Sequence, residues 1–110
     1  MKAHQINLER YRTEGSKVFT TRPRGIEVRE KSNINILETQ HSRIDIIVPE
    51  SISSVNPSFL EEFLHDVVVK LGETGFHNKF HFINEGHYNI QSDLEEGIGR
   101  ILRDQTALNQ

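Results

Sequence analysis

The sequence predicts an α/β domain, in which strands alternate with amphipathic helices. The first observation is the run RIDIIVP at residues 43–49, which is nearly continuous in branched apolar residues, as in a strand buried on both faces. The second is the run that follows it, where apolar residues recur at helical spacing from residue 57 onward. The third is that the same order, a strand and then a helix, is repeated toward the C-terminus.

The composition is that of one soluble domain. The chain has 110 residues, of which 35% are hydrophobic and 26% charged, enough to bury one modest core. The absence of cysteine excludes disulfides, thiolate zinc sites and a cysteine nucleophile. No apolar run approaches the roughly 20 residues of a membrane-spanning helix, and the first residues lack the apolar core of a signal peptide. We therefore expect a single cytoplasmic domain over residues 1–110, with no membrane segment.

Two short β-prone pieces begin the chain. Ile6 and Leu8 fall on one face of a strand within residues 4–11, and SKVFTT at residues 16–21 is the second piece. A turn at Glu14-Gly15 separates the two pieces, so we expect them to form a hairpin.

Residues 22–37 fit two structures. Their apolar residues alternate as in a strand at two places, and they also recur at helical spacing. Pro23 suits a first helical turn, whereas Gly25 weakens a helix. The residues alone favour the helix only slightly, and the strand stays open.

The helix that begins at Pro57 is the strongest prediction. Asn56 is a good N-cap, because its side chain can accept a hydrogen bond from an amide of the first turn. Proline fits the first helical position, where no amide hydrogen is needed. Gly72 is expected to stop the helix. The apolar stripe consists of Phe59, Leu60, Phe63, Leu64, Val67, Val68 and Leu71.

A strand and a helix are expected to complete the domain. Residues 75–84 predict a strand, with the apolar residues near its end. Residues 91–104 predict a helix, in which Ser92 and Glu95 have the spacing of a capping box.

The charge is unevenly distributed. The net charge is −3, but residues 1–31 hold eight Lys or Arg against four Glu, a net charge of +4. Such asymmetry marks either a polyanion-binding end or a solvated surface with chance clustering. The candidate residues for binding a polyanion are Arg10, Arg12, Arg22 and Arg24.

Neither a metal site nor a catalytic motif is predicted. His77 and His81 would share a face of a strand, but about 13 Å apart at about 3.3 Å per residue, too far for one metal ion even with His87 nearby. The sequence contains no phosphate-binding Gly-rich loop, no Gly-x-Ser-x-Gly and no His-Glu-x-x-His. We therefore expect no metal, no cofactor and no enzymatic activity.

Ser58 can be read in two ways. Serine is common near helix starts, so this residue can be purely structural. A phosphate on the first turn of a helix would also meet backbone amides and the positive end of the helix dipole. Ser58 is therefore a candidate phosphorylation site.

Several motifs resemble those of a known family. The run RIDIIVPESISSVNPSFLEEFL resembles STAS domains, the fold of bacterial anti-sigma-factor antagonists. A closer resemblance is to a STAS-like family of unknown function in bacteria and their mobile elements. In that family TTRPRGIEVRE resembles the start of the first helix, and GFHNKFHFIN resembles the next strand, which ends in Asn84. The resemblance covers roughly residues 15–104.

The resemblance implies that residues 22–37 are helical, within a mixed β-sheet of about four strands flanked by three helices. It aligns Ser58 with the phosphoacceptor serine of the antagonists, Asn56 with their aspartate and Pro57 with their first serine. Phe59 stands where the antagonists have glycine, so the chain departs from their pattern there. The partners implied are a histidine-kinase-like ATPase or a serine kinase.

These observations together predict a non-enzymatic regulatory module that binds a partner protein, with a homodimer also compatible. The expected contact surface is the start and exposed face of the helix at Pro57, formed by Asn56, Ser58, Glu61, Glu62 and His65. The alternative is a regulator that binds nucleic acid or phosphate through the four arginines of the basic N-terminal third.

Overall fold

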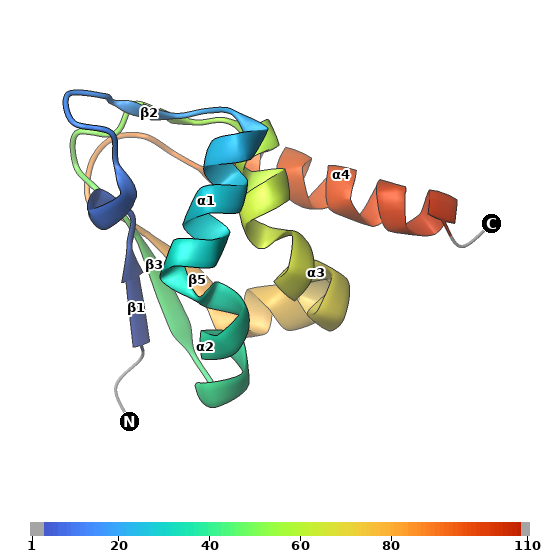
Figure 1. Cartoon of the computed structure of the whole chain (residues 1–110). Helices are drawn as coiled ribbons and strands as arrows, with labels where there is room; N and C mark the ends of the chain where they lie inside the picture. Colours follow the sequence, from blue (N-terminus) through green and yellow to red (C-terminus); the bar gives the residue numbers. More distant parts are fainter. Residues whose placement is uncertain (1–3, 109–110) are drawn as a thin grey trace.

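The computed structural model describes residues 4–108 and confirms the α/β class (Figure 1). A 3-10 turn, η1 (Leu8–Tyr11), follows the first strand. The strands are β1 (His4–Asn7), β2 (Val18–Phe19), β3 (Ile44–Val48), β4 (Ser54–Val55) and β5 (Phe80–Asn84). The helices are α1 (Arg22–Ser32), α2 (Ile34–Gln40), α3 (Pro57–Lys79) and α4 (Gln91–Leu108).

The strands of the described chain form two separate parallel sheets instead of one mixed sheet. The larger sheet has the order β1-β3-β5, and its register places Ile46 between Ile6 and Phe82. The smaller sheet pairs β2 with β4. All these pairs are parallel because helices lie between the paired strands in sequence, and a parallel connection needs such a crossover.

The expected N-terminal hairpin is wrong. After β1 the chain turns through η1, and β2 pairs with β4 instead of β1. Phe19 of β2 is buried with its ring 5.1 Å from that of Phe59, and its carbonyl accepts a hydrogen bond of 2.8 Å from the amide of Asn56. Burial of Phe19 against α3 therefore outweighs the local turn signal.

The helical reading of residues 22–37 is confirmed, but the segment forms two helices. The Thr21 side chain caps α1 by accepting a hydrogen bond from the amide of Arg24. Asn33 has a φ of 57° and a ψ of 34°, which separates α1 from α2. Asparagine is one of the few residues that adopt this left-handed conformation readily.

Gly72 interrupts α3 without ending it. Its φ of 74° and ψ of 173° break the helical path, as a glycine can, yet the chain is helical again through Lys79. The predicted strand at residues 75–84 is therefore wrong in its first half, and β5 begins only at Phe80. The reason is that the last helical turn places Phe76 in the core, stacked 4.9 Å from the ring of Phe80.

Helix α4 begins at Gln91, two residues earlier than the start at Asp93 that a capping box of Ser92 and Glu95 requires. The side chain of Asn89 accepts a hydrogen bond of 2.9 Å from the amide of Gln91. Ser92 and Glu95 therefore both lie inside the helix, and the carboxylate of Glu95 accepts instead from the side chain of Gln91.

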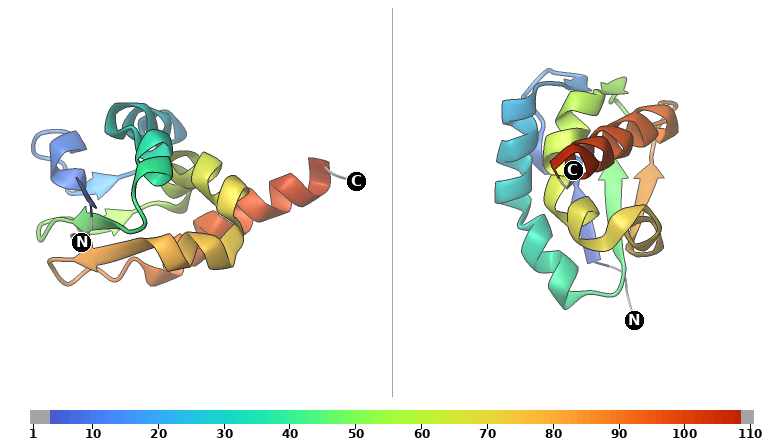
Figure 2. Two further views of the ribbon diagram at one scale, coloured as in Figure 1. Left: turned by 90° about the horizontal axis from the view of Figure 1, so that it is seen from below. Right: turned by 90° about the vertical axis from the view of Figure 1, so that its right-hand side faces the viewer.

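The helices lie on one side of the three-stranded sheet (Figures 1 and 2). The face toward them is apolar and buried, as Ile44, Ile46 and Val48 of β3 show. On the opposite face Gln5 and Ile83 are exposed. Helix α3 is central, since both α1 and α4 pack on it. Within residues 4–108, no helix is both long and apolar enough to cross a membrane.

Candidate functional site

The start of α3 has the local structure that the sequence predicts. The Oδ1 atom of Asn56 accepts a hydrogen bond of 2.7 Å from the amide of Ser58, and Asn56 has extended backbone angles. Pro57 occupies the first helical position. This arrangement sets Ser58 in the first turn of a helix whose next turns are buried.

Ser58 is half-buried and has a specific partner. Its Oγ accepts a hydrogen bond of 3.1 Å from Nη1 of Arg100 on α4. Sequence reasoning missed Arg100, because it lies 42 residues away and only the packing of α4 on α3 brings it to the site. The guanidinium of Arg100 thus fixes the position of the half-buried serine hydroxyl.

Glu61 is buried, which corrects its assignment to the exposed face of the helix. Only 6% of the residue is exposed. Its Oε2 lies 3.0 Å from Nη1 of Arg22, and its Oε1 lies 3.9 Å from Nη1 of Arg100. Among the described residues Oε1 has no hydrogen-bond partner. The hydrogen bond from Arg22 to Glu61 raises the pKa of Arg22 further above its ordinary value.

Glu62 and His65 stay nearer the surface. The carboxylate of Glu62 lies 3.4 Å from Nη1 of Arg22, and its carbonyl accepts a hydrogen bond of 2.8 Å from Arg29. Nδ1 of His65 is 2.9 Å from a carboxylate oxygen of Asp66. This contact is the main cause that lowers the pKa of Asp66, against the opposing effect of its burial. We call Arg22, Ser58, Glu61, Glu62 and Arg100 the α3 cluster.

Two glycines allow α1 and α4 to approach the start of α3 closely. A Cβ atom added to Gly25 on α1 would lie 2.4 Å from the carbonyl oxygen of Phe59. A Cβ atom on Gly97 of α4 would lie 3.1 Å from the Cβ of Leu60. The first turns of α3 are therefore enclosed on two sides, and Glu61 is covered although it lies off the apolar stripe.

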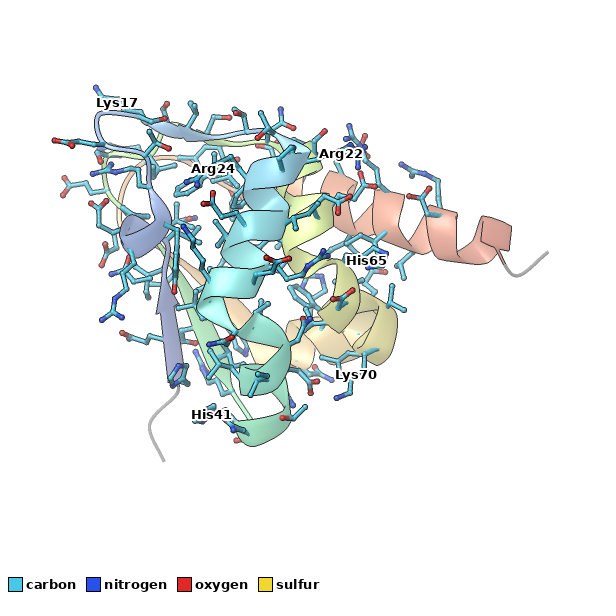
Figure 3. The ribbon with its side chains drawn as sticks, viewed as in Figure 1. Lys17, Arg22, Arg24, His41, His65 and Lys70 are labelled. Atoms are coloured by element: carbon cyan, nitrogen blue, oxygen red, sulfur yellow. The ribbon has the colours of Figure 1, made fainter. Side chains whose placement is uncertain are left out.

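The four arginines of the basic N-terminal third do not form one surface. Arg10, Arg12 and Arg24 line a common pocket, whereas Arg22 is paired with Glu61 and Glu62. Figure 3 shows Arg22 and Arg24 on opposite sides of α1.

Metal ligands do not gather in the described part of the chain, where no three His, Asp or Glu side chains are placed to hold an ion. His77, expected in a strand, lies in the last turn of α3, so its spacing from His81 is not that of one strand.

Comparisons with known proteins found no matching family model, no matching curated protein and no matching solved structure. The resemblance to STAS-like domains therefore rests on the sequence motifs alone.

Proposed function

We propose that the chain is a STAS-like, non-enzymatic regulatory module that binds a partner protein through the N-terminal end of α3. The observation that supports this most is the half-buried hydroxyl of Ser58, in the first turn of α3 and hydrogen-bonded to Arg100. A serine in this setting can be modified at the surface without taking apart the core beneath it. The resemblance of the surrounding motif to the antagonists agrees with this role.

The contact surface consists of the residues at the start of α3 that reach solvent. Asn56 is exposed, and Ser58, Glu62 and His65 are half-buried. Buried Glu61 takes no direct part in this surface. It acts from beneath, because its carboxylate attracts Arg22 and Arg100 from two other helices. The partner would meet a patch that combines hydroxyl, carboxylate, imidazole and guanidinium groups.

Phosphorylation of Ser58 would change the charge of this patch. A phosphate carries about two negative charges and accepts strong hydrogen bonds from arginine, so it would draw Arg100 toward it. Glu61 and Glu62 would repel the same phosphate, which keeps the gain in helix stability small. The modification would act on partner binding, and the modifying partner would be a serine kinase or a histidine-kinase-like ATPase.

The proposal is tested by comparing three variants in a pull-down from the native host. Ser58→Ala should capture the same partner as the wild-type chain, and Ser58→Glu should capture less of it, because the added charge lies in the contact surface. Ser42→Glu, which adds the same charge at the exposed connection between α2 and β3, is the matched control and should bind normally.

The captured protein is identified by mass spectrometry, and its affinity for each purified variant is then measured. Circular dichroism verifies that all variants fold. Equal affinity of Ser58→Glu and the wild-type chain would rule out the switch, and failure to capture any specific partner would count against the interaction module itself.

A further inference from the structure

A basic pocket lies on the side of α1 that faces away from the α3 cluster. It has a volume of about 200 Å³ and is formed by η1, the residues just after η1 and one face of α1. Its charged lining comes from Arg10, Arg12, Arg24, Glu27 and Lys31. The three residues on α1 are spaced by three and four positions, which places them on a single helix face. We call this the η1–α1 pocket.

Two of its arginines are held in place by neighbouring groups. The guanidinium of Arg24 donates hydrogen bonds to the carboxylate of Glu27 and to the carbonyl oxygen of Tyr11. The guanidinium of Arg12 donates to Glu9 at 2.8 Å and to the hydroxyl of Ser51. These bonds fix the planes of both groups. Binding of a ligand therefore costs little side-chain entropy, because these two long side chains are already ordered.

The lining carries an excess of positive charge. Four of its residues are cationic and only Glu27 is acidic. Lys31 lies 2.8 Å from the carboxylate of Glu27. Its hydrogen bond is the main cause that lowers the pKa of Glu27, and Arg24 adds to it, so the carboxylate stays ionised at neutral pH. The net charge of the lining is therefore +3.

Among the described residues, Arg10 is the cation of the pocket lining that has no carboxylate partner. It is exposed, and it makes no ion pair or side-chain hydrogen bond with the residues that the structure describes. Arg12, Arg24 and Lys31 each have a carboxylate partner, which offsets part of their charge. An anion in the pocket would thus meet one uncompensated guanidinium and two oriented ones.

We propose that the η1–α1 pocket binds a small phosphate monoester. Arginine is suited to phosphate because its planar donors match two phosphate oxygens at once. The pocket volume limits the size of the ligand, because about 200 Å³ is less than the roughly 300–1,000 Å³ of pockets for drug-sized molecules. The pocket therefore accepts a phosphate group with a small substituent. This inference does not depend on the proposed function, because the pocket shares no residue with the α3 cluster.

The test is a titration of the full chain, labelled with ¹⁵N, with inorganic phosphate and with glycerol 3-phosphate at low salt. We expect saturable binding that shifts amide signals of residues 10–13 and 24–31. Arg10→Ala should weaken the affinity by about tenfold, the scale of one lost charged hydrogen bond. Arg43→Ala is the matched control, since this exposed arginine pairs with Asp45 away from the pocket and should leave the affinity unchanged.

The pH dependence identifies the ligand chemistry. Arginine stays charged at every pH of the experiment, whereas a phosphate monoester takes up a proton below about pH 6 and loses one charge. Affinity for glycerol 3-phosphate should therefore fall as the pH is lowered through that range, while affinity for sulfate should not. Three results would overturn the proposal. The first is no saturable binding up to about 10 mM phosphate, which is above a dissociation constant in the millimolar range. The others are an equal loss of affinity in Arg10→Ala and Arg43→Ala, and an oligonucleotide that binds more tightly than the monoester.

Discussion

The buried carboxylate of Glu38 connects α2 with α3. It lies on α2 with only 5% of its side chain exposed, and its two carboxylate oxygens accept hydrogen bonds from Lys70 at 2.6 Å and from Lys79 at 2.9 Å. The two lysines stand on either side of the break at Gly72, so one carboxylate joins both segments of α3 to α2. Figure 3 shows Lys70 on α3.

The first prediction concerns the removal of this charge. Glu38→Gln should lower the free energy of unfolding by about 1–3 kcal/mol, because a neutral amide removes the negative charge that pairs with both lysines. Lys79 would keep only its hydrogen bond of 2.7 Å to the backbone carbonyl of Glu38. Most of the effect should come from Lys79, since Lys70 is 55% exposed and its ion pair is screened by water. Urea denaturation measures the change. Glu30→Gln, at an exposed position on α1, should change stability by less than about 0.5 kcal/mol.

The same residue predicts a loss of stability in acid. Burial raises the pKa of Glu38, but the hydrogen bonds from Lys70 and Lys79 outweigh it and hold the pKa below its ordinary value. A carboxyl group with a lowered pKa stabilises the fold above its unfolded pKa of about 4.3, and this stabilisation is lost as the pH falls through the folded value. The difference between wild type and Glu38→Gln should therefore shrink below about pH 4. A difference that is constant from pH 7 to pH 3 would contradict the ionic role.

At the scale of the elements, the packing of α1 and α4 on α3 depends on glycine. Gly25 and Gly97 each sit where a side chain would meet α3, although both lie inside helices, where glycine is unfavourable. The close approach of three helices is what brings Arg22 and Arg100 to the buried carboxylate of Glu61. The glycines therefore support the candidate site as well as the core.

The second prediction compares glycines on the same helices. Gly25→Ala should lower stability by about 1–3 kcal/mol, since its Cβ would lie 2.4 Å from a backbone oxygen of α3 that cannot move away. Gly97→Ala should cost less, because its nearest neighbour is 3.1 Å away. Gly99→Ala is the control: its Cβ would meet only the flexible end of Arg103, and alanine should stabilise α4 by up to about 1 kcal/mol. Thermal denaturation should rank the three variants in this order, and a neutral Gly25→Ala would refute the close contact.

Considered as a whole, the molecule has one core that joins both sheets to the helices. Phe63 is fully buried, with its ring 5.7 Å from that of Phe59, which in turn packs on Phe19 of the smaller sheet. The residues buried beneath the helices on the larger sheet belong to the same cluster. We therefore expect the two sheets to unfold together.

The third prediction tests this cooperativity. Phe63→Ala should cost about 3–5 kcal/mol, as large aromatic truncations in cores do. Circular dichroism of the helices and fluorescence of the two tyrosines should report the same unfolding midpoint, both before and after the substitution. A cost below about 1 kcal/mol would mean that Phe63 is not central to the core. Separate midpoints for the two probes would contradict a single cooperative unfolding transition.

Part of the candidate site could be predicted from local sequence. The side chain of Asn56 caps the amide only two residues away, and Pro57 then sets the first turn, so the position of Ser58 in that turn depends on neighbours alone. Arg100 and the burial of Glu61 could not be predicted in this way. Both depend on how α4 packs against α3, and no local pattern encodes that packing.

The class of the fold and the elements with strong local signals could be predicted from the amino-acid sequence. The branched apolar run of β3, the cap and stripe of α3 and the apolar face of α4 each follow from residues close together in the chain. Three other features depend on how the chain packs: β2 pairs with β4, Gly72 bends α3 without ending it, and the body of α1 separates Arg22 from Arg24. The first two features depend on burying Phe19 and Phe76 in the common core, and the third depends on the packing of α1 on α3. The gain in free energy from this burial exceeds the local preferences of the chain.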